Sequence, residues 1–552
     1  MQGPAGVSRP GPDAPDPAPA DADPPVATPP ATPARRRSGM LRSSMVFTSM
    51  TFLSRIAGYV RDRLQASFFG ADATVDAFVV AYRIPNYLRR IFAEGSFASA
   101  FVPVLSELKQ KGDDRALQDF LDHVAGALLA SVLVVTALGM IGAPWIARLF
   151  MLFAEPGSER VELTASMLRI TFPYLAFISM TALAGAVLNT FRRFGLPALT
   201  PVLHNLAVIA AMLLLGRWLG MGAEALAWGV VAAGALQLLV LWPAMRRVGA
   251  SPRLRFDPRH AGVRRVGRLM LPTIFSSSVA QVNLLVGTMF ASGLIAGSQS
   301  WLYYSDRLTE LPLGLFGVAI GTVILPQLSR HHADSDAAGY SHALDWGLRI
   351  VLLVGLPAAL GIALLAQPLT AALFLTGEFT AYDTRMTSMA LMAMCVGIPA
   401  FMLTKVLLPA FYARQDTKTP MRAAVATVVV NVALTVALVL PWQRAGLVGA
   451  HAGIALATAL AGTVNAALLW RWLRRAGVYT AEPGWTRWLL QIAAALVAMA
   501  AVVQVVAWHA GDFTALPTAL RWAWLLGAIG AGALAYGATL LVLGVRPRHL
   551  RH

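Results

Sequence analysis

Uncharged apolar stretches long enough to cross a lipid bilayer recur along this sequence, and they constrain its fold more than any other feature. A transmembrane helix needs about 20 such residues. Clear examples are 126–147, 350–375, 489–508 and 522–545. Charged residues make up only 13% of the 552 residues and hydrophobic residues 57%, so too few charges remain to solvate several soluble domains. The sequence therefore predicts an all-α, polytopic membrane protein.

Breaks at Pro, Gly and charged residues divide the chain into fourteen predicted transmembrane helices. They cover residues 43–66, 74–105, 118–146, 164–189, 197–216, 223–244, 269–292, 299–329, 343–366, 384–412, 423–440, 446–470, 488–508 and 522–545. An even number of spans places both termini on the same side of the membrane.

Positive charge in the loops predicts the orientation, because Lys and Arg gather in cytoplasmic loops. Of the 45 Lys and Arg residues, 29 lie in loops on the amino-terminal side of the predicted helices and six in loops on the other side. This asymmetry predicts that both termini are cytoplasmic. It also accounts for the formal net charge of +17, so we expect no nucleic-acid partner.

The Pro- and Ala-rich tail over residues 1–40 contains no apolar stretch, so we expect a disordered cytoplasmic extension rather than a cleaved signal peptide.

A faint internal repeat divides the rest of the chain. Matched pairs at an offset of about 225 residues are Pro103 with Pro326, Pro173 with Pro399, and Asn205 with Asn431. The repeat predicts six-helix lobes over 41–247 and 248–475, followed by two helices and a short tail over 476–552. Two lobes with a substrate site between them are typical of secondary transporters.

Ionisable side chains interrupt several of the apolar helices. Each such charge costs about 2.5–3.5 kcal/mol at the centre of a membrane helix. In the first helix, Arg61, Asp62 and Gln65 lie on one polar stripe. The intramembrane charges, in which seven cations face five anions, are Arg55, Arg61, Asp62, Asp76, Arg83, Arg89, Arg90, Glu94, Asp306, Arg307, Glu310 and Lys405. Asn86 adds an amide to the same face as Arg83 and Arg89.

Two interpretations of these charges remain open. Some of them have a partner one turn away, and such pairs could simply fix helix packing. Packing alone seldom justifies three buried guanidiniums from three helices, as Arg61, Arg89 and Arg307 would be. The planar guanidinium matches phosphate oxygens bidentately and keeps its charge when desolvated. We therefore predict an anionic ligand that bears phosphate.

Motifs of soluble enzymes and metal sites are missing from the sequence. It contains no Walker A, GxGxxG or HExxH pattern, so we expect neither catalysis nor a bound metal or cofactor. The single cysteine, Cys395, excludes a disulfide framework. His331 and His332 are expected to be solvated, and His204 and His451 to pack between helices.

Long motifs in the charged helices resemble those of a known family. They are SRIAGYVRDRLQASFFGADATVDAFVVAYRIPNYLRRIFAEGSFASAFVPVLSELK over 54–109, WLYYSDRLTELPLGLFGVAIGTVILPQLS over 301–329 and KVLLPAFYARQDTKTP over 405–420. These segments resemble the MurJ (MviN) family of lipid II flippases, and the resemblance covers residues 40–545.

The resemblance implies both a fold and a task. The fold is that of the multidrug/oligosaccharidyl-lipid/polysaccharide exporters, in which two six-helix lobes surround a central cavity and two further helices form a lipid-facing groove. The implied task is alternating-access transport of lipid II, the undecaprenyl-diphosphate-linked disaccharide-pentapeptide. It would move from the inner to the outer leaflet of the bacterial cytoplasmic membrane for peptidoglycan synthesis. The groove would fall to the helices at 488–508 and 522–545.

The resemblance also implies a set of substrate-binding residues. Arg61, Asp62, Arg89 and Arg307 occupy positions where the family places cavity residues that engage the diphosphate. The other charged or polar positions that match the family are Arg55, Asp76, Asn86, Glu94, Asp306 and Lys405.

The driving force for transport is a separate question, and the family offers one candidate for it. Some members of the family bind Na⁺ through acidic residues of the carboxy-terminal lobe. Here the helix at 269–292 has Gln281 and Asn283 but no Asp, and those at 423–440 and 446–470 contain no acid, so the sequence does not support a sodium site. The membrane potential or an ion gradient is the expected driving force. Expected partners are lipid II, membrane lipids and a cell-wall synthesis complex.

Four alternatives remain at this point. The chain could export another prenyl-diphosphate-linked glycan, or extrude cationic drugs, although drug extrusion predicts an acidic, aromatic cavity. It could be a membrane glycosyltransferase that uses the carboxylates of Asp306 and Glu310. It could also be a scaffold of a cell-wall assembly complex, in which case neutralising the cavity arginines would leave its function intact.

Overall fold

Apolar segments bounded by Pro, Gly and charged residues form helices throughout the computed structural model, which describes residues 35–89, 96–155 and 157–545. Within these ranges the chain forms no strand, so the predicted all-α fold is confirmed. The first half contains α1 (Arg35–Phe69), α2 (Ala73–Arg89), α3 (Ser96–Lys111), α4 (Asp114–Ile141), α5 (Ala143–Phe150), α6 (Glu159–Thr171), α7 (Tyr174–Thr190), α8 (Gly195–Ala211), the π-helical turn η2 (Met212–Trp218) and α9 (Glu224–Arg247). The second half contains α10 (Ala261–Ser292), α11 (Ser298–Pro312), the π-helical turn η3 (Leu313–Gly317), α12 (Val318–Ala333), α13 (Ala337–Leu364), α14 (Ala366–Phe374), α15 (Ala381–Cys395), α16 (Ile398–Tyr412), α17 (Lys418–Arg444), α18 (Ala450–Arg475), α19 (Trp485–Ala510) and α20 (Thr518–Val542).

The described residues from 46 onward form one compact unit, which contains the helix contacts and sites of this protein. Residues 1–45 are a separate unit. The helix α1 begins at Arg35, inside the segment for which a disordered tail was predicted. The remainder of that predicted tail, residues 1–34, lies outside the described residues.

The fourteen predicted segments fall on helices wherever the structure describes them, but several are divided in two. Within the described residues, nine helices are long and apolar enough to cross a membrane. A tenth span results if α15 and α16, which meet at an angle of 43°, are counted together. The chain is therefore a multi-pass membrane protein, and the count of fourteen spans and the cytoplasmic termini stay predictions.

Proline residues account for two of the places where the structure divides a predicted span into two helices. Pro173 stands at the start of α7 and Pro399 at the start of α16. Proline lacks an amide hydrogen and therefore suits the beginning of a helix. These two prolines are one of the pairs matched by the internal repeat, and a second pair, Asn205 and Asn431, is buried on α8 and α17. The division into lobes stays a prediction that these placements favour.

Close contacts between helices depend on small residues, because lipid tails leave no hydrophobic driving force for helices to associate in a membrane. A Cβ atom at Gly462 of α18 would lie 2.1 Å from the ring of Phe401 on α16. A Cβ atom at Gly139 of α4 would lie 2.1 Å from the ring of Phe172. Glycine at these positions lets an aromatic ring pack directly on a neighbouring backbone.

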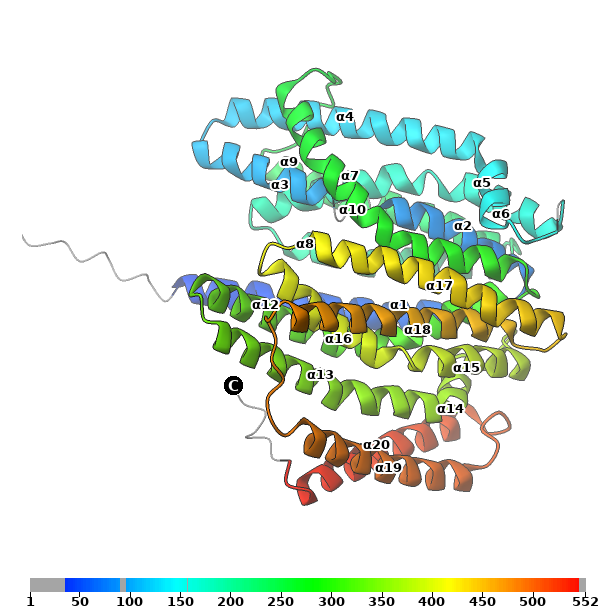
Figure 1. Cartoon of the computed structure of the whole chain (residues 1–552). Helices are drawn as coiled ribbons and strands as arrows, with labels where there is room; N and C mark the ends of the chain where they lie inside the picture. Colours follow the sequence, from blue (N-terminus) through cyan, green and yellow to red (C-terminus); the bar gives the residue numbers. More distant parts are fainter. Residues whose placement is uncertain (1–34, 90–95, 156, 546–552) are drawn as a thin grey trace, which may run out of the picture. The chain divides into compact units, whose positions relative to one another are not determined.

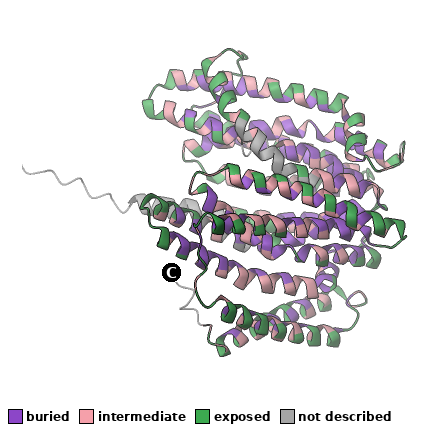
Figure 2. Ribbon diagram, viewed as in Figure 1, coloured by how far each residue is buried: buried purple, intermediate pink, exposed green. Residues whose placement is uncertain are grey.

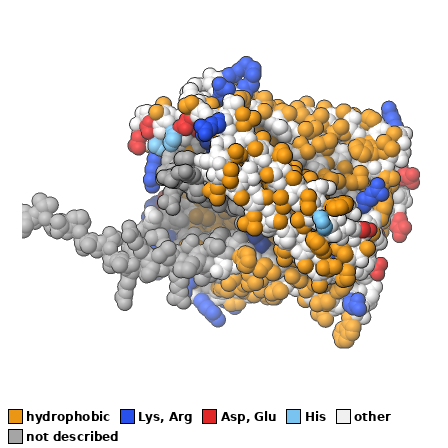
Figure 3. Space-filling model, turned by 90° about the horizontal axis from the view of Figure 1, so that it is seen from below, with side chains coloured by type: hydrophobic (Ala, Val, Ile, Leu, Met, Phe, Trp, Pro, Cys, Tyr) orange, Lys and Arg blue, Asp and Glu red, His pale blue; other side chains and the backbone are white. Residues whose placement is uncertain are grey.

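The last two helices, α19 and α20, form a hairpin that packs on α13 and α14 (Figure 1). Its buried residues include Met499, Val503, Leu525 and Ala528. Much of the remaining hairpin surface is exposed (Figure 2), and only 22% of the most apolar window of each helix is buried. Figure 3 shows hydrophobic side chains across the middle of this face and charged side chains toward its ends. That distribution is typical of a surface in contact with lipid.

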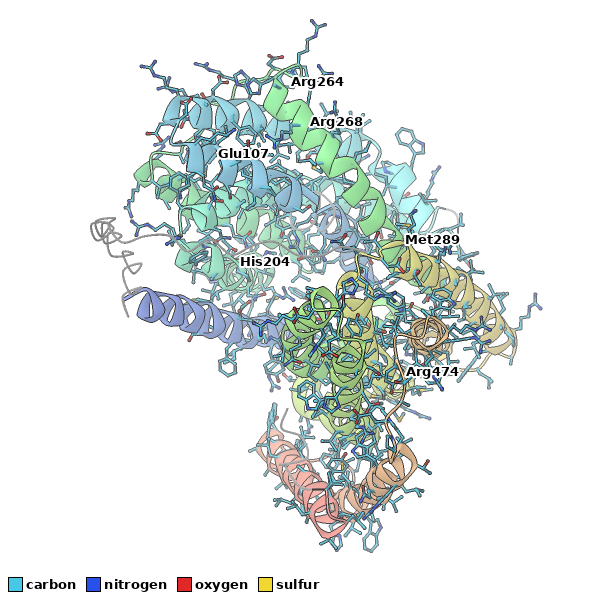
Figure 4. All side chains as sticks on the ribbon, turned by 60° about the vertical axis from the view of Figure 1, so that its left-hand side comes forward. Glu107, His204, Arg264, Arg268, Met289 and Arg474 are labelled. Atoms are coloured by element: carbon cyan, nitrogen blue, oxygen red, sulfur yellow. The ribbon has the colours of Figure 1, made fainter. Side chains whose placement is uncertain are left out.

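An ion-pair cluster outside the predicted spans joins α3 to α10. The Glu107 carboxylate accepts hydrogen bonds from Lys111 Nζ at 2.7 Å and from Arg265 Nη2 at 2.8 Å. These bonds lower the pKa of the Glu107 carboxyl. Figure 4 shows Glu107 near the end of α10 that carries Arg264 and Arg268. The first helical turns of α10 are thus held against the first half of the chain.

Candidate functional site

A buried carboxylate between two guanidiniums forms the centre of the candidate site. Asp62 of α1 is only 3% exposed. Its Oδ1 lies 2.6 Å from Nη2 of Arg61 on the same helix, and its Oδ2 lies 2.8 Å from Nε of Arg307 on α11. Because two arginines share this carboxylate, the trio retains an excess of positive charge.

Protein atoms surround the guanidinium of Arg61. Its Nη1 donates to Oδ1 of Asn205 on α8 at 3.0 Å, and its Nη2 donates to the hydroxyl of Tyr303 on α11 at 3.0 Å. The Tyr303 hydroxyl donates in turn to Oδ1 of Asp62 at 2.9 Å. Three helices therefore meet at this cluster, which Arg61 holds together from the inside.

A cavity of about 760 Å³ lies beside the cluster, and its wall includes Arg55, Asp62, Arg307, Glu310 and Lys405. The side chain of Arg307 is 35% exposed, whereas that of Arg61 is 9% exposed. Arg307 is therefore the guanidinium that faces the cavity, and Arg61 lies behind it.

Two further cations reach the cavity across glycine residues. A Cβ atom at Gly314 would lie 2.5 Å from Nη2 of Arg55, and a Cβ atom at Gly317 would lie 3.3 Å from Cγ of Lys405. Both glycines belong to η3, the π-helical turn that follows Pro312. Such turns interrupt a regular helix and are frequent at functional sites. The sequence LPLGLFG thus supplies both the interruption and the space for the two cations.

Arg89 lies on α2 and does not line this cavity. Its Nε and Nη2 donate to Oδ1 of Asn86, one turn earlier, at 3.0 Å and 2.8 Å. Arg61, Arg89 and Arg307 all act electrostatically on His204 of α8, which is labelled in Figure 4. The three predicted arginines therefore lie around one part of the interior. Of the other candidates in the predicted span 74–105, Arg90 and Glu94 lie outside the described residues.

His204 itself packs against aromatic rings. Its imidazole lies 6.3 Å from the ring of Tyr82 and 5.9 Å from the ring of Tyr174, measured between centroids. This environment agrees with the prediction that His204 packs between helices.

Asp76 lies in a different contact, between α2 and the start of α11. It is fully buried. Its Oδ2 accepts the backbone N–H of Gly297 at 2.9 Å, and its Oδ1 accepts the backbone N–H and the hydroxyl of Ser300 at 2.8 Å and 2.7 Å. Arg160 Nη2 lies 3.6 Å from Oδ2. Asp76 therefore caps α11, which a carboxylate at a helix N-terminus does favourably, and contact with substrate stays a prediction for it.

The two carboxylates of α11 both lie close to arginines. Glu310 Oε2 lies 3.1 Å from Nη1 of Arg307, and the Glu310 side chain is 57% exposed. Among the described residues, Arg83, Glu310 and Arg307 lie close enough to act electrostatically on Asp306. Carboxylates placed in this way balance part of the cationic charge around the cavity.

Asn205 and Tyr303 complete the cluster, although the sequence does not predict them as members of it. The available signal for Asn205 is an amide in the middle of an otherwise apolar helix, which is costly unless it is bonded. The signal for Tyr303 is its position one turn before Arg307 on α11. Neither signal identifies the partner, because Arg61 is 144 residues from Asn205 and 242 residues from Tyr303.

Comparisons of the sequence with known proteins agree with one another. The profile of the family described as "Lipid II flippase MurJ" matches residues 65–517. A probable lipid II flippase MurJ of Haemophilus influenzae is 42% identical over 511 residues, which cover 90% of this chain and 99% of that protein. A lipid II flippase MurJ of Burkholderia cenocepacia is 41% identical over 465 residues, which cover 84% of this chain and 88% of that protein.

Solved structures show the same relationship in three dimensions. A lipid II flippase MurJ in an inward closed conformation matches with a TM-score of 0.74 and 27% identity, covering 90% of this chain and 98% of that one. An inward-facing multidrug resistance MATE transporter of the MOP superfamily shares the fold, with a TM-score of 0.64, 16% identity, and coverage of 79% and 98%. With its cationic cavity, its multi-pass helical fold and these relatives, the chain belongs to the MurJ family of lipid II flippases.

Proposed function

We propose that this protein moves lipid II from the inner to the outer leaflet of the bacterial cytoplasmic membrane, for peptidoglycan synthesis. One observation carries the proposal. The guanidinium of Arg307 is anchored by the buried carboxylate of Asp62 and is still 35% exposed to a large cavity. Such a group suits the diphosphate that links the prenyl chain of lipid II to its sugars. The names of its curated relatives support the same substrate.

The diphosphate binds by replacing weak contacts of Arg307. Nη1 of Arg307 contacts the exposed carboxylate of Glu310 at 3.1 Å. An exposed ion pair of this kind is worth only about 0–1 kcal/mol, so phosphate oxygens can displace it. Nε of Arg307 stays on Asp62, which keeps the guanidinium plane oriented. Arg55 and Lys405 add charge from two other helices.

Substrate binding then favours one conformation over another. Arg55 belongs to the predicted amino-terminal lobe, whereas Arg307 and Lys405 belong to the predicted carboxy-terminal lobe. A diphosphate that contacts all three reduces the repulsion between them and stabilises the state in which they are close. This differential affinity shifts the population of conformers, which is the physical requirement for alternating access.

The prenyl chain of lipid II needs an apolar surface outside the cavity. We place it along α19 and α20, whose apolar surfaces are largely exposed.

The orientation, the driving force and the partner complete the proposal. We place both termini in the cytoplasm, on the side that carries most of the loop Lys and Arg. We propose the membrane potential or an ion gradient as the driving force, since each charge moved through 100 mV is worth about 2.3 kcal/mol. A cell-wall synthesis complex is the proposed partner on the product side.

The test is rescue of a bacterium that has been depleted of its own lipid II flippase. Wild type is compared with Arg61→Ala, Arg89→Ala, Arg307→Ala and Arg307→Lys at matched membrane levels. The control is Arg330→Ala, which removes an exposed arginine near the end of α12. The readouts are growth and the amount of lipid II in the outer leaflet.

We expect wild type and Arg330→Ala to restore both readouts, and Arg307→Ala to restore neither. Arg307→Lys should give a partial result, because it keeps the charge and loses the planar fork. A well-expressed wild type that fails to rescue would contradict the substrate. Full rescue by the three Ala variants of the interior arginines would contradict the site and favour a scaffold.

A further inference from the structure

Three potential metal ligands lie together near the beginning of α4. None of them belongs to the wall of the cationic cavity. They are Asp119 and His123 of α4 and His260, which precedes α10. One ligand atom of each lies within 4.8 Å of the other two. We propose that this cluster binds a divalent transition metal of the Zn²⁺ class and thereby fastens the connection between α9 and α10 to α4.

The geometry of the three side chains suits such an ion. Asp119 and His123 are four residues apart and therefore lie on one face of α4. His260 Nε2 lies 3.0 Å from Oδ2 of Asp119, and His123 Nδ1 lies 3.4 Å from Oδ1 of the same carboxylate. The side chains are 50%, 14% and 22% exposed for Asp119, His123 and His260. An ion can therefore enter from solvent, and water can fill the open coordination position.

The two imidazoles lie face to face beside this carboxylate. The rings of His123 and His260 lie 4.2 Å apart between centroids, with an angle of 7° between their planes. Imidazole nitrogens from two elements are therefore gathered next to one carboxylate, as a metal that prefers nitrogen ligands requires.

The ligand set also selects the class of metal. Ca²⁺ and Mg²⁺ need several oxygen ligands, and the cluster offers one carboxylate and two imidazoles, a combination typical of Zn²⁺. The neighbouring carboxylate of Asp122 is engaged elsewhere, since Oδ1 accepts from Gln118 Nε2 and from the backbone N–H of Arg253. Arg255 lies near Oδ2 of the same carboxylate at 3.8 Å. Arg253 and Arg255 make these surroundings basic, so a cation held by electrostatic attraction alone would be repelled. Only an ion that forms coordinate bonds with the three ligands would be retained.

Two existing contacts decide which imidazole nitrogens can ligate. His123 Nδ1 lies 2.8 Å from the carbonyl oxygen of Asp119, to which it can only donate, so His123 ligates through Nε2. His260 Nδ1 accepts the backbone N–H of Gly262 at 3.2 Å, as the cap of α10, and this contact has to yield. Coordination through Nε2 requires the opposite tautomer and gives up this long, partly exposed hydrogen bond. A coordinate bond to the ion replaces it.

A bound ion would strengthen a connection that the chain already makes. The segment before α10 is tied to α4 because the backbone N–H of Arg255 donates to the Asp122 carbonyl oxygen at 3.0 Å. It also packs so closely that a Cβ atom at Gly126 would lie 2.1 Å from the Arg255 carbonyl oxygen. This segment links the two predicted lobes, so the metal would restrain α10 at the end where the chain passes between them.

The test uses the full chain, purified in detergent without a polyhistidine tag and stripped with a chelator. Zn²⁺ binding is measured by titration calorimetry, and Co²⁺ is used as a spectroscopic probe of the ligands. The variants are His123→Gln, Asp119→Asn and His260→Asn, the last of which keeps a side-chain acceptor for the cap. The matched control is His331→Gln, since His331 pairs with Asp336 at 2.9 Å in an exposed turn that lacks a third ligand among the described residues.

We expect one Zn²⁺ per chain, bound at least tenfold more weakly in each of the three variants and unchanged in His331→Gln. We also expect the Co²⁺ absorption bands of wild type to disappear in His123→Gln. Equal Zn²⁺ affinity in wild type and His123→Gln would overturn the proposal, as would an equal loss in His331→Gln. No binding by the wild-type chain, with an unchanged melting temperature upon adding Zn²⁺, would also overturn it.

Discussion

Asp62 is the side chain on which the charge balance of the site depends. Its Oδ1 binds Arg61, and its Oδ2 binds Arg307. Without this carboxylate, two guanidiniums would face each other in the interior, and the hydroxyl of Tyr303 would lose its acceptor. Breaking a buried ion pair by removing one partner costs about 3–5 kcal/mol, although solvent screens Arg307, whose side chain is 35% exposed.

Replacing Asp62 by Asn should therefore lower the thermal stability of the purified protein by about 3 kcal/mol, the lower end of that range. The change should also abolish rescue of the depleted strain. The measurement is thermal unfolding in one detergent. The control is Glu310→Gln, the same chemical change on a side chain that is 57% exposed, which should cost about 0–1 kcal/mol. Similar melting temperatures for the two variants would show that Asp62 is not the anchor.

For single residues, the sequence predicts the chemistry of a side chain better than it predicts which other side chains that residue contacts. The polar stripe of α1 and the motif around Arg307 correctly indicate that these charges meet in the interior. The stripe does not reveal that Arg61 is enclosed by Asn205 and Tyr303, which come from distant helices. Asp76, which the resemblance to the family assigns to the substrate, caps α11 in the structure, and its contact with substrate stays a prediction. Long-range pairing of this kind is decided by tertiary packing and leaves no periodic pattern.

Among the helices, the hairpin of α19 and α20 depends on one buried carboxylate of α13. Asp345 Oδ1 accepts from the hydroxyl of Tyr479 at 2.7 Å and from Nε1 of Trp485 at 2.8 Å, and Oδ2 accepts from Nε of Arg349 at 2.7 Å. Tyr479 lies in the linker after α18, and Trp485 is the first residue of α19. Asp345 therefore anchors the beginning of the hairpin that we assign to the prenyl chain.

Asp345→Ala should release this linker while α19 stays helical. Hydrogen exchange of the amides between residues 477 and 485 should become at least tenfold faster, because four donors, among them the backbone N–H of Glu482, lose their acceptor and local opening costs less. The control is Glu482→Ala in the same linker, where the carboxylate is 38% exposed and pairs with His342. Unchanged exchange in Asp345→Ala would mean that apolar packing alone holds the linker.

Glycine contacts between helices give a second prediction at the scale of elements. Gly462→Ala places a methyl group against the ring of Phe401 and should destabilise the protein by about 1–3 kcal/mol, the usual cost of overpacking. Gly527→Ala in α20 meets no atom within 4 Å and should be neutral or stabilising by up to about 1 kcal/mol, since Ala favours helix. Thermal unfolding of both variants compares them directly. Equal effects would argue against tight packing of α16 on α18.

The sequence predicts the positions of the helices well and their interruptions poorly. Hydropathy finds long apolar stretches, but it averages over Pro173 and Pro399, where the structure divides one predicted span into two helices. The short helices α5 and α14 are largely missed, since the predicted spans 118–146 and 343–366 end within the first residues of each. A Pro residue only permits a break, and packing decides whether the helix bends or continues.

For the whole molecule, alternating access requires one end of the helical unit to be closed while the cavity is open at the other. In this structure Asp76 seals a contact between α2 and the start of α11, and the cavity wall includes Ser54 of α1. Ser298, which follows the Gly297 that Asp76 contacts, is fully buried. The sequence contains a single cysteine, Cys395, which is 2% exposed. A chain with Cys395→Ala therefore provides a background for labelling introduced cysteines.

In that background, Ser54→Cys should react with a membrane-impermeant maleimide from the cytoplasmic face, in inside-out vesicles, and inorganic diphosphate should slow the reaction. Ser298→Cys should resist the reagent from both faces, because Ser298 is fully buried between the two residues that Asp76 contacts, Gly297 and Ser300. Adding Asp76→Ala removes the cap of α11 and should make Ser298→Cys reactive from the opposite, outer face of intact cells, at least tenfold faster than before. Labelling of both positions from the same face would contradict the proposed orientation of the two ends. A rate at Ser298→Cys that Asp76→Ala leaves unchanged would show that this contact does not separate during transport.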